Sequence, residues 1–376
     1  MAQGQGFLAQ LRALVDKISR FWRRRGVAID MGASTVRVYL EDKGVLVDEP
    51  CVVALDRAAD RIVAVGQEAY QMIGRTAADT VVLRPAIDGS LTHYEVTQKL
   101  LQYYIRLATK SLLRPPRVMI CLPEETTEME ESLLVSLARD AGAGKVYFME
   151  SALACAYGTG CDLSRPIGRM IVDIGGSTTK IAVISMGGVV ISKTIRIGGD
   201  ALDASIVAYV RDRYGVLIGE RAGETIKKRI GALYVHRMVR SVEVKGRDAT
   251  TGQPQKATLT SKEMIEAMAA PAVAIINAIE DVFAMTPEAL QADIMRDGVM
   301  LCGGASLVYG FGRLITKATG LPVRSLKDPS LVCVLGAARA LQLPKGQELT
   351  PGPIHLERQL KRRRGESAAP QESEDE

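Results

Sequence analysis

A short segment occurs twice in this chain, and this repeat restricts the possible folds more than any other feature of the sequence. Residues 29–35 read Ile-Asp-Met-Gly-Ala-Ser-Thr, and residues 172–178 read Val-Asp-Ile-Gly-Gly-Ser-Thr. In both copies a short apolar strand precedes the Asp, and an alternating apolar strand follows the Thr. Each copy therefore predicts a strand, a tight turn and a second strand, and the repeat predicts two related halves.

The residue types at the two turns are suited to binding phosphate. Glycine and other small residues let backbone N–H groups approach an anion closely, and Ser and Thr hydroxyls add donors. An Asp just before such a turn can hold the water shell of a Mg²⁺ ion. Two ordinary hairpins are the simpler alternative, but the shared register of two copies favours a pair of phosphate-binding loops. The candidate residues are Asp30, Gly32, Ala33, Ser34 and Thr35 in the first copy and Asp173, Gly175, Gly176, Ser177 and Thr178 in the second.

A third turn follows the apolar strand at residues 299–302. Gly303, Gly304 and Ala305 come directly after this strand, and a turn of this kind can let a flat base lie against the backbone. The signal is weak alone, because Gly-Gly turns after strands are common in α/β folds. The chain contains no GxxxxGK[ST] motif and no GxGxxG after a strand, so P-loop and Rossmann sites have little support.

The rest of the chain alternates short apolar strands with helical stretches, which is typical of an α/β protein. The length of 376 residues suggests two or three domains. Strands are predicted at residues 27–29, 36–40, 45–47, 52–55, 62–65, 118–122, 170–174 and 181–184. Helices are predicted at residues 96–110, 128–141, 201–214, 222–233 and 261–283, and a loop or hairpin is predicted at residues 244–256.

Composition argues against several classes of protein. A chain that is 47% hydrophobic and 24% charged fits neither a disordered nor a fibrous protein. The net charge of +5 is too small to indicate nucleic-acid binding. The six cysteines lie in apolar runs without a CxxC pair, which indicates reduced core thiols rather than disulfides or a zinc site. The three histidines lie far apart in the sequence, which argues against a His-based catalytic triad.

The two ends of the chain differ from its middle. Residues 7–25 have apolar side chains at helical spacing beside a basic face, so we expect an amphipathic helix that binds an anionic membrane surface. A helix that packs on a neighbouring element or a partner protein is the alternative. No apolar stretch reaches the ~20 residues that a membrane-spanning helix needs. The expected membrane contacts are Phe7, Leu8, Leu11, Leu14, Ile18, Phe21 and Trp22.

With the hairpins and the third turn placed, the sequence is similar to the MreB-like bacterial actins, within the actin and heat-shock ATPase superfamily. The similarity extends over residues 27–341, and its most specific stretches are residues 65–69, 72–76, 83–85, 88–89, 116–123, 172–185, 197–200, 218–221 and 328–340. It implies an α/β actin-like ATPase fold with two duplicated halves, or four subdomains, around a nucleotide cleft. The expected parts are an N-terminal helix (1–26), a first half (27–165), a second half (166–345, with a small subdomain near 200–285) and a basic, then acidic, disordered tail (346–376).

The resemblance also implies roles for single residues. Asp30 and Asp173 would hold Mg²⁺ through water, and the two loops would bind the phosphates of ATP. Gly198, Gly199 and Asp200 would flank the nucleotide, Glu224 and Lys227 would hold its ribose and base, and Gly303, Gly304 and Ala305 would form the adenosine turn. Without the resemblance, Glu224 and Lys227 would be a surface pair three residues apart on a helix. The loop residues Leu112 and Leu113 would form a second membrane contact.

The chain departs from the family pattern at one position that matters for catalysis. The family has a Glu-Glu-Pro run before an Ala-rich helix, whereas this chain has Glu150, Ser151 and Ala152. Ser151 stands where the resemblance implies a water-positioning carboxylate, so we expect slow hydrolysis. Glu150 is an alternative catalytic residue, and Asp173 or Thr178 alone is another. Three smaller changes, Ala33 and Ser34 for Thr and Ala and Ser177 for Gly, should preserve phosphate binding.

The resemblance implies a filament protein that binds ATP and Mg²⁺ and polymerises on the inner face of the cytoplasmic membrane, supporting cell shape and wall synthesis. Its expected partners are other copies of itself, an anionic membrane surface and cell-wall elongation proteins, with no nucleic acid. The main alternative is a nucleotide-binding filament scaffold with little or no hydrolysis and a different positioning role. A metabolite kinase lacks an identifiable carboxylate base here, and a heat-shock chaperone would need a peptide-binding domain after the ATPase. The choice between ATP and GTP stays open.

Overall fold

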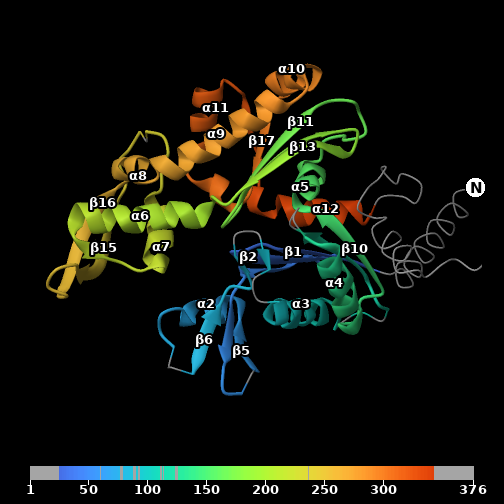
Figure 1. The fold of residues 1–376 in the computed structure, drawn as a ribbon, viewed down its shortest axis with the longest axis horizontal. Coiled ribbons are helices and arrows are strands. Elements are labelled where there is room, and N and C mark those ends of the chain that lie inside the picture. The colour runs from blue at the N-terminus through green and yellow to red at the C-terminus, as the bar shows by residue number, and fades with distance from the viewer. Residues whose placement is uncertain are drawn as a thin grey trace, which may run out of the picture.

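The chain forms two large β-sheets that lie one above the other, with helices between and around them (Figure 1). The computed structural model describes residues 25–342, except 60, 77–78, 88–89, 92–93, 111, 113, 123–125 and 236. The expected N-terminal helix and C-terminal tail therefore lie outside the described residues. Each large sheet contains one of the two repeated hairpins.

The first sheet has five strands in the order β10-β9-β1-β2-β3, and β1 pairs with β2 antiparallel but with β9 parallel. Helices α3 and α4 cover the face of the sheet that carries Val27, Ile29 and Val38, and these side chains share one buried cluster with both helices. The strands are β1 (Gly26–Met31), β2 (Thr35–Leu40), β3 (Gly44–Pro50), β9 (Arg117–Leu122) and β10 (Lys145–Glu150). The helices are α3 (Tyr94–Thr109) and α4 (Glu128–Asp140).

The second sheet repeats this topology with the order β13-β12-β11-β17-β18, in which β11 pairs antiparallel with β12 and parallel with β17. Helices α9, α10 and α11 cover it (Figure 1). The strands are β11 (Arg169–Ile174), β12 (Thr179–Ser185), β13 (Gly188–Ile195), β17 (Val299–Cys302) and β18 (Val323–Ser325). The helices are α9 (Ala269–Met285), α10 (Glu288–Asp297), α11 (Phe311–Thr319) and the short turns η1 (Gly304–Leu307) and η2 (Pro329–Leu331).

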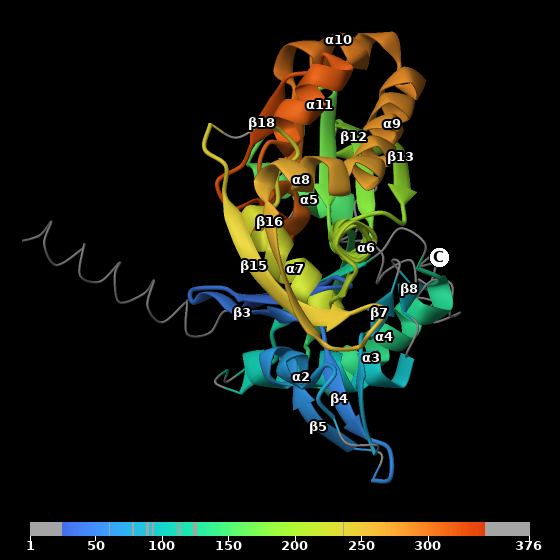
Figure 2. The same ribbon diagram turned by 90° about the vertical axis from the view of Figure 1, so that its left-hand side faces the viewer.

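Two smaller units extend from the sheets on one side of the molecule (Figures 1 and 2). One of them contains residues 241–260, which form an antiparallel hairpin. The sequence allowed either a loop or a hairpin at residues 244–256, and the hairpin is observed. The first unit contains β4 (Val53–Asp56), β5 (Arg61–Val65), α2 (Gly66–Met72), β6 (Thr80–Leu83), β7 (Ala86–Ile87) and β8 (Ser90–Leu91). The second contains α6 (Gly199–Tyr214), β14 (Val216–Leu217), α7 (Glu220–Ile230), β15 (Ser241–Asp248), β16 (Pro254–Thr260) and α8 (Ser261–Ala267).

Helices α5 (Ser151–Thr159) and α12 (Val332–Ala340) pack against each other between the two large sheets (Figure 1). A Cβ on Gly336 of α12 would lie 1.7 Å from the carbonyl oxygen of Ala154 on α5, so only glycine permits this approach. The cluster around the two helices takes side chains from both sheets, including Ala28 of β1 and Ile171 of β11. The halves therefore share one apolar seam beneath the hairpin turns.

One predicted element is wrong. Residues 261–283 were expected to form a single helix, but α8 and α9 meet at Met268 with a bend of 58°. Pro271 lies at the start of α9 and has no N–H to bond the carbonyl of Ala267, so the helical ladder is interrupted there. Among the described residues, no single helix is long and apolar enough to cross a membrane; this bent pair passes by length and composition alone.

Candidate functional site

The two repeated hairpins have the same local geometry in the structure. Gly32 N–H donates to the carbonyl of Thr35 at 3.0 Å, and Gly175 N–H donates to the carbonyl of Thr178 at 2.9 Å. Each turn therefore closes by the same hydrogen bond, and the small residues at its tip border the space between the halves. Residues 32–34 of one turn and residues 175–177 of the other line the same cavity.

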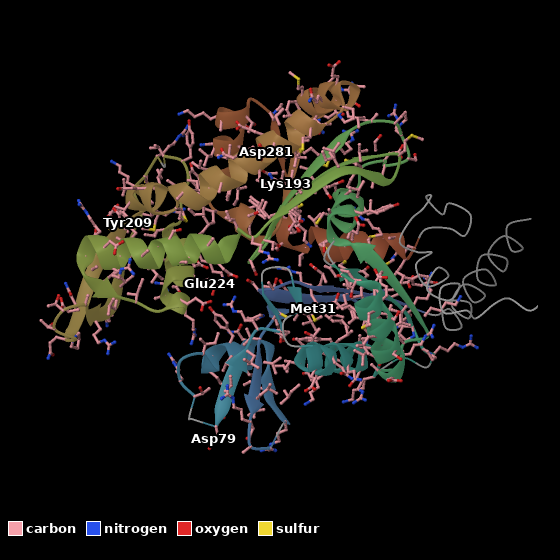
Figure 3. All side chains as sticks on the ribbon, viewed as in Figure 1. Met31, Asp79, Lys193, Tyr209, Glu224 and Asp281 are labelled. Carbon is pink, nitrogen blue, oxygen red and sulfur yellow. The ribbon has the colours of Figure 1, made fainter. Side chains whose placement is uncertain are left out.

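This cavity has a volume of about 800 Å³ and lies between the two sheets. Its lining includes both Met31, at the end of β1, and Glu224, on α7, which Figure 3 labels. Two of the predicted nucleotide-binding and catalytic residues, Gly198 and Glu150, are absent from the lining. The predicted residues that do line it are Asp30, Gly32, Ala33, Ser34, Thr35, Ser151, Asp173, Gly175, Gly176, Ser177, Thr178, Gly199, Asp200, Glu224, Lys227, Gly303, Gly304 and Ala305.

The two turns come so close together that one position requires glycine. A Cβ on Gly176 would lie 1.8 Å from Oγ of Ser34 in the other turn. Ser34 Oγ in turn donates to the carboxylate of Asp200, at 3.2 Å from Oδ1. The first turn is thus tied to the start of α6 across the cleft, and both turns can contact one ligand at once.

The segment at residues 198–200 supports the second turn from beneath. Gly199 N–H donates to the carbonyl of Gly175 at 2.9 Å, and Asp200 N–H donates to the carbonyl of Gly176 at 2.8 Å. These amides are therefore used within the protein and fix the second turn. Gly198 packs behind them, where a Cβ would lie 2.5 Å from the carbonyl oxygen of Gly176.

Glu224 and Lys227 on α7 each have their own partners, so the structure does not show the simple surface pair that was the alternative for them. Lys227 Nζ donates to the carbonyl of Gly199 at 2.8 Å and to Oδ2 of Asp203 at 2.7 Å. Burial raises the pKa of Asp203 to about 6, although its contact with Lys227 opposes this. Glu224 pairs with Lys228 at 2.6 Å and accepts a hydrogen bond from the hydroxyl of Tyr70 across the cleft.

The third turn gives the cavity a flat, open wall. Gly303 has φ of +86°, and a Cβ there would lie 2.2 Å from the carbonyl oxygen of Ile174, so this position needs glycine. A Cβ at Gly304 would meet nothing within 4 Å. Backbone without side chains therefore faces the cavity beside Ala305, which suits the stacking of a planar group.

The floor of the cavity carries two carboxylates, each beside a basic side chain. Asp30 pairs in register with Arg37, whose guanidinium lies 3.8 Å from its carboxylate, and Asp173 pairs in register with Lys180. Burial raises the pKa of Asp30 well above its usual range and raises the pKa of Asp173 to about 6, while Arg37 and Lys180 oppose both shifts. Two partly desolvated carboxylates in the same cavity as the two small-residue turns fit a hydrated divalent cation.

Arg37 and Lys180 line the cavity but were not among the predicted residues. The sequence contained a signal for them, because each lies the same distance after the Asp of its hairpin. On an antiparallel hairpin that spacing brings the cation opposite the Asp. The repeat thus includes a basic residue on each second strand, which adds positive charge on both sides of the cavity.

Ser151 and Glu150 differ in their access to the cavity. Ser151 is the first residue of α5, is 6% exposed and donates from Oγ to the carbonyl of Leu122 at 3.1 Å. It contributes to the cavity lining, whereas Glu150, the last residue of β10, points to the exposed side and does not. The position where a carboxylate was expected to face the cavity is therefore occupied by a short hydroxyl side chain.

The predicted membrane residues Phe7, Leu8, Leu11, Leu14, Ile18, Phe21, Trp22 and Leu113 lie outside the described residues. Leu112 is described, is partly buried and packs against the apolar core of the first sheet. It is therefore less available to lipid than the sequence suggested, because part of its side chain already contacts the protein.

The chain as a whole is similar to proteins of one described family. Residues 24–348 match the protein family described as MreB/Mbl protein. The cell shape-determining protein MreB of Escherichia coli K12 is 40% identical over 323 residues, which cover 84% of this chain and 93% of that protein. The cell shape-determining protein Mbl of Bacillus subtilis 168 is 37% identical over 326 residues, covering 85% and 98%.

Solved structures share the fold. The crystal structure of MreB5 of Spiroplasma citri bound to ADP superposes with a TM-score of 0.80 at 31% identity, covering 85% of this chain and 96% of that one. A second MreB5 structure, bound to AMPPNP, gives the same TM-score of 0.80. A MamK double helical filament has a TM-score of 0.70 at 22% identity, a likeness of fold alone. The predicted α/β actin-like fold of two related halves is thereby confirmed.

Proposed function

The chain belongs to the MreB/Mbl family, and from this membership we propose that it is a cytoskeletal filament protein that binds ATP with Mg²⁺ in the cleft between its halves. The observation that carries the proposal is the convergence of both repeated turns and the Gly303 turn on a single cavity. A nucleotide needs backbone without large side chains around its phosphates and against its base. The two repeated turns meet the first need, and the Gly303 turn meets the second. The related MreB5 structures contain ADP and AMPPNP at comparable overall geometry.

In this proposal each part of the cavity contacts one part of the nucleotide. The tips of the two turns offer N–H groups and the hydroxyls of Ser34 and Thr178 to the phosphates, and Arg37 and Lys180 add positive charge. Asp30 and Asp173 hold the water shell of Mg²⁺, which, when bound, neutralises phosphate charge. The base lies against the Gly303 turn, and Glu224 and Lys227 on α7 border the ribose.

Isothermal titration calorimetry with Mg-ATP tests the site. Asp173→Ala should weaken binding by more than about tenfold, because it removes a carboxylate that orders the cation's water shell. Asp281→Ala is the matched control, since Asp281 pairs with Lys193 on the surface of the second sheet, away from the cavity (Figure 3). Equal affinity of wild type and Asp173→Ala would remove Asp173 from the proposed cation site.

Ser151 favours a second function within the same framework, a filament scaffold that binds nucleotide but hydrolyses it slowly. The nucleotide-binding turns are complete, whereas the cavity-facing start of α5 carries no carboxylate. Attack of water on a γ-phosphate depends on an oriented water and a group that accepts its proton. Slow hydrolysis would leave assembled filaments long-lived, which suits a positioning role as well as a role in cell shape.

The cellular part of the proposal rests on the relatives. The MreB and Mbl proteins that this chain resembles are described as cell shape-determining. We place this chain in the same process, assembling on itself at the inner face of the cytoplasmic membrane through residues 7–25 and acting with cell-wall elongation proteins. Its sequence supports the membrane contact by combining an apolar stripe with the basic residues that follow it.

A further inference from the structure

The repeat that builds the nucleotide cleft also places a cysteine beside each of the two buried carboxylates. Asp30 of β1 lies in register with Cys121 of β9, and Asp173 of β11 lies in register with Cys302 of β17. Residues in register on parallel strands extend to the same face of the sheet, one strand spacing apart. Each half therefore carries an Asp–Cys pair at the same place, although the sequence separates the members widely.

The two helices at the seam add one thiol to each pair. Cys333 of α12 joins Asp30 and Cys121, and Cys155 of α5 joins Cys302 and Asp173. In each group the ligand atoms all lie within 4.8 Å of one another. On a tetrahedral zinc ion, two sulfurs that are each ~2.3 Å from the metal lie about 3.8 Å apart. The two sulfurs of either group are therefore at most about 1 Å farther apart than they would be on zinc.

We propose that Asp30, Cys121 and Cys333 form a binding site for a thiophilic divalent cation, with Zn²⁺ as the fitting ion. Two thiolates and one carboxylate satisfy three positions of a tetrahedral centre, and the cavity supplies the open fourth position. Such a donor set selects a softer ion than Mg²⁺, which prefers oxygen ligands alone. The absence of a CxxC pair hid the site in the sequence, because the three donors come from three separate elements.

Access distinguishes this group from its counterpart in the other half. Cys121 and Cys333 line the cavity, with exposed fractions of 4% and 6%, whereas Cys155 and Cys302 are 1% and 0% exposed and do not line it. An ion that enters the cleft therefore reaches the first group directly. Arg37, 3.8 Å from Asp30, and Lys180 line the same cavity and favour the ionised form of the Asp30 carboxyl. The ligands must lose their protons before the ion binds, so binding releases protons to solvent.

Zinc in this site would also affect nucleotide binding, and this part of the inference rests on the function proposed above. Asp30 belongs to both the thiol site and the proposed magnesium site, so one ion excludes the other from this carboxylate. Zn²⁺ in the thiol site should therefore weaken Mg-ATP binding. Metal binding itself requires no nucleotide, and a failure of ATP binding leaves the thiol site unaffected.

Cobalt titration of the reduced full-length protein under argon, without nucleotide, tests the site directly. Co²⁺ should give thiolate-to-cobalt charge-transfer absorption that Zn²⁺ abolishes. The absorption should fall by about half in Cys121→Ser and Cys333→Ser and disappear in the double variant, with Zn²⁺ affinity reduced more than about tenfold in a chelator competition. The matched controls, Cys302→Ser from the other half and Cys161→Ser outside both groups, should keep it.

A measurement on wild type alone guards against variants that fold poorly. Zn²⁺ should slow iodoacetamide alkylation of Cys121 and Cys333, read peptide by peptide in a mass spectrometer, and leave Cys161 unchanged. Absence of thiolate absorption in the wild type would overturn the proposal. So would equal loss of the signal in Cys302→Ser, full signal in the double variant, or alkylation that Zn²⁺ does not slow.

Discussion

Single residues at the floor of the cleft combine burial with opposite charge. Asp30 and Asp173 are held away from bulk water, which favours their neutral forms, while Arg37 and Lys180 favour the ionised forms. A bound cation would shift this balance toward the carboxylates. Binding of a cation, and not folding alone, would therefore set the charge of these two carboxyl groups.

This balance predicts a pH dependence for magnesium-dependent nucleotide binding. The pKa of Asp173 is raised to about 6, so its carboxyl is protonated below that pH and cannot order the cation's water shell. The magnesium-dependent part of the affinity should therefore be largest above about pH 7 and decline as the pH falls through about 6. Calorimetry with ADP, with and without Mg²⁺, measures that part. In Asp173→Asn the decline should be much smaller; an unchanged decline would assign it to another group.

Ser151 predicts slow hydrolysis that a single change can accelerate. In Ser151→Glu a carboxylate reaches into the cavity from the start of α5 and can orient the attacking water, an effect typically worth ~10²–10⁴-fold in rate. Single-turnover phosphate release should therefore be faster in Ser151→Glu than in wild type, with ATP affinity unchanged. Glu150→Ala is the control and should change little, because Glu150 does not line the cavity.

The opposite pattern would reassign the catalytic residue. If wild type hydrolyses ATP as fast as Ser151→Glu, and Glu150→Ala abolishes hydrolysis, then Glu150 acts despite its position at the exposed end of β10. If neither change has an effect, Asp173 or Thr178 positions the water without help.

At the scale of elements, the hairpins and the third turn could be predicted because their signals are local. A Gly-containing turn between alternating strands specifies its own geometry, and the repeat doubles the signal. The apolar periodicity of residues 261–283 continues past the break between α8 and α9, so it predicts one helix even though Pro271 lies within it. The partners of Lys227 and the thiol groups could not be predicted, since they depend on which strands and helices become neighbours in the folded chain.

The N-terminal segment carries a prediction of its own. Residues 7–25 combine an apolar stripe with a basic cluster, and each basic residue near an anionic surface contributes about 1 kcal/mol. Deletion of residues 1–25 should abolish or strongly reduce sedimentation with anionic vesicles, while neutral vesicles should bind either form weakly. Equal sedimentation of the full and shortened chains would show that another surface, or none, binds the membrane.

At the scale of the whole molecule, the two halves meet at the α5–α12 seam and at the cleft, so a nucleotide that contacts both turns stabilises one arrangement of the halves. Tyr70 and Glu224 already connect the two smaller units across the cleft, and Arg84 pairs with both Asp200 and Glu220. A filament subunit needs such a fixed arrangement, because repeated contacts between copies tolerate little variation in subunit shape. Nucleotide binding and assembly are therefore expected to be coupled.

Negative-stain electron microscopy of the purified protein, with and without Mg-ATP, tests the central claim most directly. We expect filaments with Mg-ATP, and far fewer without nucleotide or in Asp173→Ala, because an incomplete cation site leaves the halves less firmly held. The Asp281→Ala control should assemble like wild type. Fields without filaments across magnesium, salt and anionic-lipid conditions, from protein that calorimetry shows to bind Mg-ATP, would contradict the proposal that this chain is a filament protein.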